Sequence, residues 1–212
     1  MKNLLLSILQ LFARLMLARY KPKIIGVTGS VGKTSAKDAI YCVLSSRFRV
    51  RKSEKSYNNE VGLPLTVLGI PSSGKNIFGW FFGFLKILSG LIYTDYPEIL
   101  ILEMGVDKPK DMDYLLKMVK PDIAVFTSVG EIPVHVENFL SREALLKEKA
   151  KLALAIPKQG FVVYDSDSLD WLLFLEKIKA KTMTYGFTES PDIKIHQPEV
   201  RFFDHEESGR PI

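Results

Sequence analysis

Cysteine is almost absent from this 212-residue sequence, which contains Cys42 and no other. One thiol excludes a disulfide framework and a metal site built from cysteines, and it fits a protein of the reducing cytoplasm. Internal repeats and low-complexity tracts are lacking as well. The hydrophobic content of 47% and the charged content of 25% are those of an ordinary globular protein, so we expect one large folded domain.

Basic runs interleaved with aromatic residues, the pattern that binds nucleic acid, are also missing. The formal charge of +5 arises from 29 basic and 24 acidic residues that are spread along the chain. We therefore expect no nucleic-acid partner, because a small polyanionic substrate accounts for the positive excess equally well.

No uninterrupted apolar run reaches the length of a membrane span. The amino-terminal run Leu4–Leu9 is followed by Gln10, Arg14 and Arg19, and no small-residue cleavage site comes after it. We therefore interpret residues 1–20 as an amphipathic helix rather than a secretion signal.

A second apolar run covers residues 77–93 and contains one charged residue, Lys86. A helix of this length extends about 25 Å, which is short of the roughly 30 Å hydrocarbon core of a bilayer. We expect an exposed apolar helix or hairpin that contacts a membrane surface or a partner without spanning. Burial inside the domain is the alternative.

Short apolar runs rich in β-branched residues alternate with helical patterns. The expected strands are 23–27, 99–103, 122–127 and 160–164, and the expected helices are 33–45, 109–119 and 142–156. This alternation predicts an α/β fold, a mostly parallel sheet flanked by helices, in which all four strand ends open on one crevice. Residues 190–212 are polar and show no closing helix or strand, so we expect the fold to be incomplete at its carboxyl end.

The first strand runs into a glycine-rich turn that opens the first helix: Thr28, Gly29, Ser30, Val31, Gly32, Lys33, Thr34 and Ser35. This order is the context in which a P-loop binds ATP and Mg²⁺, so the sequence predicts a P-loop NTPase-like domain. Backbone N–H groups would face the phosphates, Lys33 would reach the terminal ones, and the Thr34 hydroxyl would ligate Mg²⁺. The strict pattern has glycine at Val27, so this is a variant; a chance Lys-Thr pair after a glycine-rich turn is the alternative.

Two further candidates follow later strands. Glu103 ends the second expected strand, where a P-loop protein holds its Mg²⁺, although a solvated strand end is the alternative. His135 follows the third expected strand and would face the same crevice, whereas a lone histidine is otherwise an ordinary loop or core residue.

Lys149 lies on the apolar stripe of the third expected helix, whose other members are Leu145, Leu152 and Ile156. The helical period directs Lys147 and Lys151 elsewhere. A lysine on this stripe either serves a function or extends its ammonium group to water at the edge of the stripe. Burial would lower the pKa of Lys149 and leave the neutral amine that carbon dioxide can carbamylate.

Residues 56–66 are a polar loop that runs into an apolar segment, with amide and hydroxyl groups that can hydrogen-bond a ligand, notably those of Asn58, Asn59 and Thr66. By composition alone it is an ordinary turn.

Together these segments resemble the Mur ligase family, the ATP-dependent amide ligases of peptidoglycan precursor synthesis. The segments that carry the resemblance are 26–34, 57–66, 103–105, and 127–135 with the helix that bears Lys149. The form Asn-Asn-Glu-x-Gly-x-Pro-Leu-Thr is most similar to the branch that adds D-alanyl-D-alanine to a UDP-muramoyl tripeptide.

The resemblance implies that residues 21–212 are part of the central ATP-binding domain, preceded by the helix 1–20. It implies that Thr34 and Glu103 bind one Mg²⁺, and that His135 and a carbamylated Lys149 organise a second. The residues expected to be catalytic are Lys33, Glu103, His135 and Lys149. We expect the family's UDP-anchoring domain and its amine-binding domain to lie outside this chain.

The implied reaction couples ATP to amide formation in the cytoplasm. A carboxylate of the UDP-muramoyl peptide attacks the γ-phosphate of ATP, and the amine of D-alanyl-D-alanine displaces phosphate from the acyl phosphate. Asn58, Asn59 and Thr66 would face the substrate.

Other functions stay open from the sequence. A polyglutamate or cyanophycin-type ligase is the alternative within the same class. A GTPase or simple phosphotransferase is disfavoured because the Asn-Lys-x-Asp guanine signature is missing. A non-catalytic nucleotide-binding or membrane-associated module is the third alternative.

Overall fold

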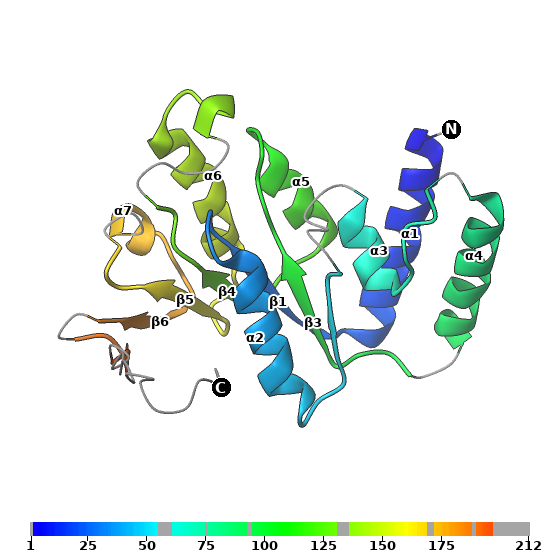
Figure 1. Ribbon diagram of the computed structural model, residues 1–212, viewed down its shortest axis with the longest axis horizontal. Helices are drawn as coiled ribbons and strands as arrows, with labels where there is room; N and C mark the ends of the chain where they lie inside the picture. Colours follow the sequence, from blue (N-terminus) through cyan, green and yellow to red (C-terminus); the bar gives the residue numbers. More distant parts are fainter. Residues whose placement is uncertain are drawn as a thin grey trace, which may run out of the picture.

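The computed structural model describes residues 2–54, 61–74, 76–92, 95–130, 136–168, 172–187 and 190–196. These residues form a seven-stranded sheet of order β2-β3-β1-β4-β5-β6-β7, in which every neighbouring pair is parallel (Figure 1). The strands are β1 (Lys23–Thr28), β2 (Val50–Lys52), β3 (Ile99–Glu103), β4 (Ile123–Phe126), β5 (Phe161–Asp165), β6 (Lys181–Gly186) and β7 (Ile193–Lys194).

Helices cover both faces of this sheet. They are α1 (Lys2–Tyr20), α2 (Lys33–Ser45), α3 (Gly62–Leu68), α4 (Ile77–Ile92), α5 (Asp111–Met118), α6 (Arg142–Ala155) and α7 (Leu172–Leu175), with a 3-10 turn at Val136–Asn138. Successive side chains of β1 alternate between the faces: Ile24 joins the large core under α1, α3, α5 and α6, whereas Ile25 and Val27 pack under α2. The expected α/β fold with a parallel sheet is confirmed.

The four strands expected from the sequence are confirmed as β1, β3, β4 and β5, each shifted by at most a residue at either end. Sequence analysis missed β2, β6 and β7. Arg51 and Lys52 make β2 too polar to stand out, and β6 alternates threonine with larger residues. The expectation that residues 190–212 lack any strand is wrong at Ile193–Lys194, where two exposed residues pair with β6 through their backbone.

The expected turn over residues 56–66 is wrong in its second half, because Gly62–Leu68 form the buried helix α3. Pro64 lies in the first turn of that helix, where its missing N–H has no intrahelical partner to lose. Gly69 ends the helix in the left-handed region with φ of 67°.

The amino-terminal helix α1 belongs to the large core. Leu9, Ala13 and Met16 are buried on its inner face. Its last residue, Tyr20, donates a hydrogen bond of 2.6 Å to the carbonyl oxygen of Gly90 in α4. Of the amphipathic helix expected for residues 1–20, Lys2–Tyr20 form a helix that packs against the core.

Residues 77–92 of the apolar run form the helix α4, which packs at the edge of the molecule beside α1 (Figure 1). Ile87 is buried, but Phe78, Phe81 and Phe82 are exposed. Across the described part of the chain, no helix combines the length and apolarity needed to cross a bilayer.

Candidate functional site

The carboxyl ends of three adjacent strands meet at one edge of the sheet. β1 lies between β3 and β4, with Val27 paired to Glu103 and Thr28 paired to Phe126. The residues that leave these strands are therefore brought together, which confirms the expectation that the strand ends share one edge.

The glycine-rich turn after β1 depends on two left-handed backbone positions. Gly29 has φ of 145°, and a Cβ there would lie 1.9 Å from the Thr127 hydroxyl oxygen; Gly32 has φ of 80°. Gly32 precedes α2, and no side chain in the described residues caps that helix end. The first-turn N–H groups of α2 are thus available to an anion, which the positive end of the helix also attracts.

Two backbone N–H groups of the turn are engaged in this structure. Ser30 and Val31 both donate to the carbonyl oxygen of Ser128, at 3.0 and 3.1 Å, and the Lys33 ammonium group donates to the Ser30 carbonyl oxygen at 3.1 Å. A phosphate bound by these two N–H groups would have to replace the Ser128 carbonyl oxygen as their hydrogen-bond acceptor. If these two N–H groups bind an anion, the loop after β4 moves or shares them.

Two buried hydroxyl groups at the turn have no hydrogen-bond partner among the described residues, namely those of Thr28 and Ser30. Buried polar atoms are nearly always paired, so unpaired ones at a strand end indicate a place for a polar ligand.

Glu103 faces α2 from the end of β3. Its carboxylate accepts a hydrogen bond of 3.1 Å from the Thr34 hydroxyl, and it lies 3.6 Å from the Lys37 ammonium group. The side chains of Glu103 and Lys37 are 3% and 2% exposed, so both charges are held away from water. Carboxylate and hydroxyl oxygens are the donors that Mg²⁺ prefers, so Thr34 and Glu103 fit this ion.

Sequence analysis missed Lys37. A signal was present, because Lys37, Ile40 and Leu44 fall at helical spacings of three and four on the inner face of α2. The same helical spacing places Lys149 on the apolar stripe of α6.

Lys149 is buried on α6, and its ammonium group donates a hydrogen bond of 2.9 Å to the carbonyl oxygen of Gly29. Burial, with a smaller contribution from the charge of Lys33, lowers the pKa of Lys149 to about 8, while Asp107 acts in the opposite direction. The structure thus places Lys149 against the glycine-rich turn.

The two neighbouring lysines point away from the turn. Lys147 forms an exposed ion pair with Glu143 at 2.6 Å. Lys151 pairs with Asp113 at 2.5 Å and with Glu148 at 2.7 Å, on the side of α6 that faces α5. They are matched controls for Lys149.

The structure tests the remaining candidate site residues less completely. Asn58, Asn59 and His135 lie outside the described residues. Thr66 is buried inside α3, where its hydroxyl donates to the Gly62 carbonyl oxygen at 3.0 Å. Val31 and Ser35 are exposed at the turn. The roles expected for all of these residues stay predictions.

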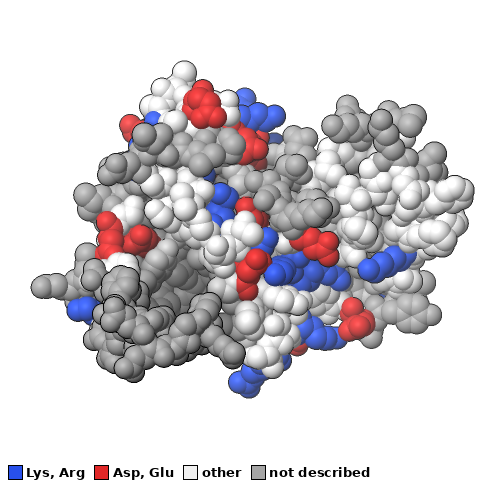
Figure 2. Space-filling model, viewed as in Figure 1, with Lys and Arg blue, Asp and Glu red and all other residues white. Residues whose placement is uncertain are grey.

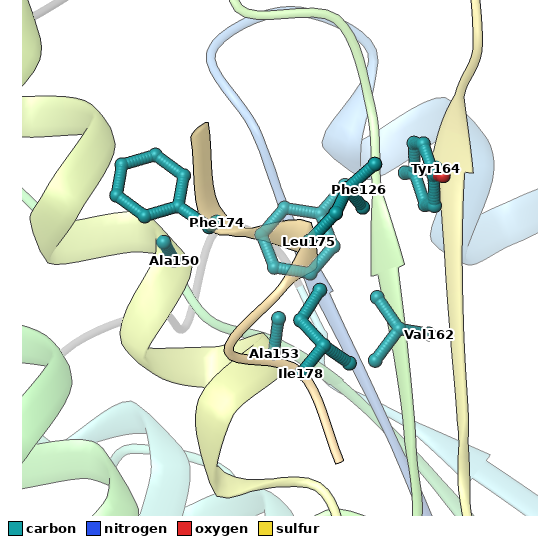
Figure 3. Close-up of a pocket in the computed structure, with 8 residues that line it drawn as sticks. All are labelled: Phe126, Ala150, Ala153, Val162, Tyr164, Phe174, Leu175 and Ile178. Carbon is teal, nitrogen blue, oxygen red and sulfur yellow. The ribbon is translucent and has the colours of Figure 1, made fainter. Parts of the chain in front are cut away.

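A separate cavity lies behind this edge, between the sheet and the helices α6 and α7. Figure 3 shows its lining: Phe126, Ala150, Ala153, Val162, Tyr164, Phe174, Leu175 and Ile178. Its volume of about 10 Å³ holds no more than a water molecule. This cavity is a packing gap in the core and cannot hold a nucleotide.

A sequence model of the Mur ligase middle domain matches residues 27–78 and 85–210. This match covers most of the chain, including the glycine-rich turn, Glu103 and Lys149. The chain belongs to the Mur ligase family. The family resemblance seen in the sequence is thereby confirmed.

Similar proteins give the Mur ligase assignment more detail. The UDP-N-acetylmuramoyl-tripeptide--D-alanyl-D-alanine ligase of Bacillus subtilis (strain 168) is 33% identical over 190 residues, which are 90% of this chain and 35% of that protein. The enzyme of the same name from Mycobacterium leprae (strain TN) is 37% identical over 144 residues, 68% of this chain and 23% of that protein.

A solved Mur ligase shares the fold. The crystal structure of MurF ligase from Thermotoga maritima in complex with ADP superposes with a TM-score of 0.68 at 28% identity, covering 87% of this chain and 37% of that chain. This chain spans about a third of the length of the curated relatives it matches.

Proposed function

We propose that this Mur ligase chain is the ATP-binding part of an amide ligase that joins D-alanyl-D-alanine to a UDP-muramoyl tripeptide in the cytoplasm. The observation that carries the proposal is the contact between the Thr34 hydroxyl and the buried Glu103 carboxylate beside an uncapped helix end. The activity for which the Bacillus subtilis and Mycobacterium leprae relatives are named supports the choice of substrates.

In this proposal the glycine-rich turn binds the phosphates of ATP. The first-turn N–H groups of α2 donate to the phosphate oxygens, and Lys33 turns from the Ser30 carbonyl oxygen to the terminal phosphates. Thr34 and Glu103 would hold Mg²⁺, which when bound neutralises charge on the transferring phosphoryl group. Lys37, one turn after Thr34 on α2, helps to keep the same Glu103 carboxylate oxygen in place.

We propose a second role for Lys149 as a carbamate. With its pKa lowered to about 8, about a tenth of its side chains carry a neutral amine at pH 7. The nitrogen lone pair of that amine can attack the carbon of carbon dioxide, and the new N–C bond forms as one proton leaves to water. The resulting carboxylate-like group, together with His135, would hold a second Mg²⁺.

The substrates would react at the same edge of the sheet. The carboxylate of the muramoyl peptide attacks the γ-phosphorus and releases ADP. The amine of D-alanyl-D-alanine then attacks the acyl phosphate carbon and expels phosphate, so the amide bond forms at the expense of one ATP. Asn58, Asn59 and Thr66 would orient the muramoyl peptide.

The nucleotide part of the proposal is tested with Lys33→Ala in this chain. Lys33 supports phosphates and does not fill the core, so we expect a loss of Mg-ATP affinity of at least tenfold with an unchanged urea midpoint. Titration calorimetry measures the affinity. Lys158→Ala, an exposed lysine before β5, should bind like the wild type. Unchanged affinity in Lys33→Ala would contradict the P-loop assignment.

The ligase part requires the longer protein. ADP release should depend on both the UDP-muramoyl tripeptide and the dipeptide. Lys149→Ala should abolish this release even with added bicarbonate, while Lys147→Ala and Lys151→Ala stay active. Nucleotide binding without turnover by the longer wild type would favour the non-catalytic alternative, and turnover with a different amine would favour another Mur-type ligase.

A further inference from the structure

The helices α1 and α4 lie side by side at one end of the molecule (Figure 1). Both helices carry exposed apolar side chains. Phe12 of α1 meets Phe84 of α4 edge-on, with ring centroids 6.3 Å apart. The exposed apolar side chains, which we name the α1–α4 face, are Leu4, Leu11 and Leu15 on α1 and Phe78, Phe81, Phe82, Leu85 and Leu88 on α4.

The exposure of this face is unusually large for side chains of this kind. Phe78 is 76% exposed and Phe82 is 65% exposed, and they lie on successive turns of one helix. Figure 2 shows the surface over α4 as white, with no acidic red. Single exposed apolar residues are ordinary, but five on one helix are the kind of cluster from which contact surfaces are built.

The charges on α1 and α4 themselves have one sign, whereas Asp95 and Glu98, which follow α4, pair with Arg49. Residues 2–37, which contain α1, include no aspartate or glutamate, and neither do residues 61–94, which contain α4. Lys86 is exposed on α4 and donates to the Gly69 carbonyl oxygen at 2.8 Å. The two helices therefore offer cations and apolar groups without any carboxylate.

A basic groove follows the flank of α1 that faces α5, on the other side of α1 from α4 (Figure 1). It has a volume of about 410 Å³ and lies between α1 and the end of α5, with four exposed cations in its lining: Arg14, Lys21, Lys117 and Lys120. Among the described residues, no carboxylate forms an ion pair with any of the four. Leu17, Ile24 and Met118 give the groove an apolar floor.

We propose that the α1–α4 face docks on an anionic membrane surface, with α4 lying in the plane of the interface and the basic groove attracting lipid phosphates. Apolar insertion combined with several nearby cations is what binds a peripheral protein to anionic lipid. A second copy fits less well, because a symmetric contact would bring the same cations together. The family model leaves out residues 1–26 and 79–84, so much of this face is additional to the matched Mur ligase domain.

This inference goes beyond the ligase proposal, and vesicle binding without nucleotide tests it separately. The 212-residue chain is sedimented with vesicles of phosphatidylcholine alone, or of phosphatidylcholine with phosphatidylglycerol, at low and high salt. We expect retention by the anionic vesicles, at least tenfold weaker retention by the neutral ones, and release at high salt.

Two variants separate the apolar and the basic contributions. Phe78→Ser with Phe82→Ser should lose retention at least tenfold, whereas Leu140→Ser, at a fully exposed leucine beside α6, should not. Lys117→Gln with Lys120→Gln should weaken retention by about fivefold for each cation removed. Lys177→Gln with Lys179→Gln, two exposed lysines beside α7 at the opposite end of Figure 1, is the matched control. Circular dichroism checks that every variant is folded.

Several results would overturn the proposal. One is the absence of retention by anionic vesicles, and another is equal retention of the wild type and the phenylalanine variant. Equal retention by neutral and anionic vesicles would remove the role of the basic groove. If sedimentation velocity shows a dimer that the phenylalanine variant dissociates, while vesicles retain neither, the face is an interface between copies.

Discussion

At the scale of single residues, the position of Glu103 depends on Lys37. The two charges lie 3.6 Å apart and are almost completely buried. Replacing Lys37 with methionine keeps the volume but leaves a buried carboxylate without its cation. We expect Lys37→Met to lower the free energy of unfolding by about 3 kcal/mol, measured by urea denaturation.

The matched double variant distinguishes charge from packing. Lys37→Met with Glu103→Gln removes both charges, so it should regain most of the stability that the single variant loses. If the double variant is as unstable as Lys37→Met, the loss comes from packing and the buried pair is not its cause.

Lys149 should make the stability of the protein depend on pH. Its pKa is about 8 in the folded chain and has a reference value of 10.5, so between these values the unfolded chain binds more protons. The free energy of unfolding should therefore rise with pH, by about 1 kcal/mol between about pH 7 and pH 9, relative to Lys149→Met. Urea midpoints in magnesium-free buffer measure this, and Lys147→Met should keep the wild-type slope.

At the scale of elements, Glu148 holds α6 against α5. Its buried carboxylate accepts from the Met112 N–H at 3.0 Å, in the first turn of α5, and pairs with Lys151. Glu148→Ala leaves that N–H unpaired and should lower the free energy of unfolding by about 2 kcal/mol. Glu143→Ala, on an exposed side of the same helix, should leave the urea midpoint almost unchanged. Equal effects of the two changes would contradict this role.

The sequence predicted the elements that form the site because their patterns are local and strong. β1, β3, β4 and β5 are mostly apolar runs, and α2 and α6 each carry some apolar residues at helical spacings. The missed strands β2 and β7 are short and polar, and they are held by backbone pairing to neighbours that no local pattern reveals. The contact between Ser128 and the Ser30 and Val31 N–H groups is likewise a property of the folded loops.

At the scale of the whole molecule, α1 contributes to the core as well as to the surface. Leu9 is 1% exposed, so Leu9→Ala should lower the free energy of unfolding by about 3 kcal/mol.

Removal of residues 1–20 should uncover α3 and leave a chain that unfolds at a lower urea concentration or precipitates. Leu4→Ser with Leu11→Ser, on the exposed side, should leave the urea midpoint unchanged. A stable soluble chain without residues 1–20 would contradict this.

The order of the strands in the sheet has a consequence for synthesis on the ribosome. Ile25 of β1 pairs with Ile101 of β3 and Ile123 of β4. The central strand therefore cannot pair until residues about 75 to 100 positions further along the chain have been synthesised. Chains dominated by such distant pairings have a high contact order and fold slowly. During this delay α1 and α4 have already been made with their apolar side chains uncovered. The nascent chain can therefore bind a membrane or a chaperone through these side chains before the strands of its sheet pair.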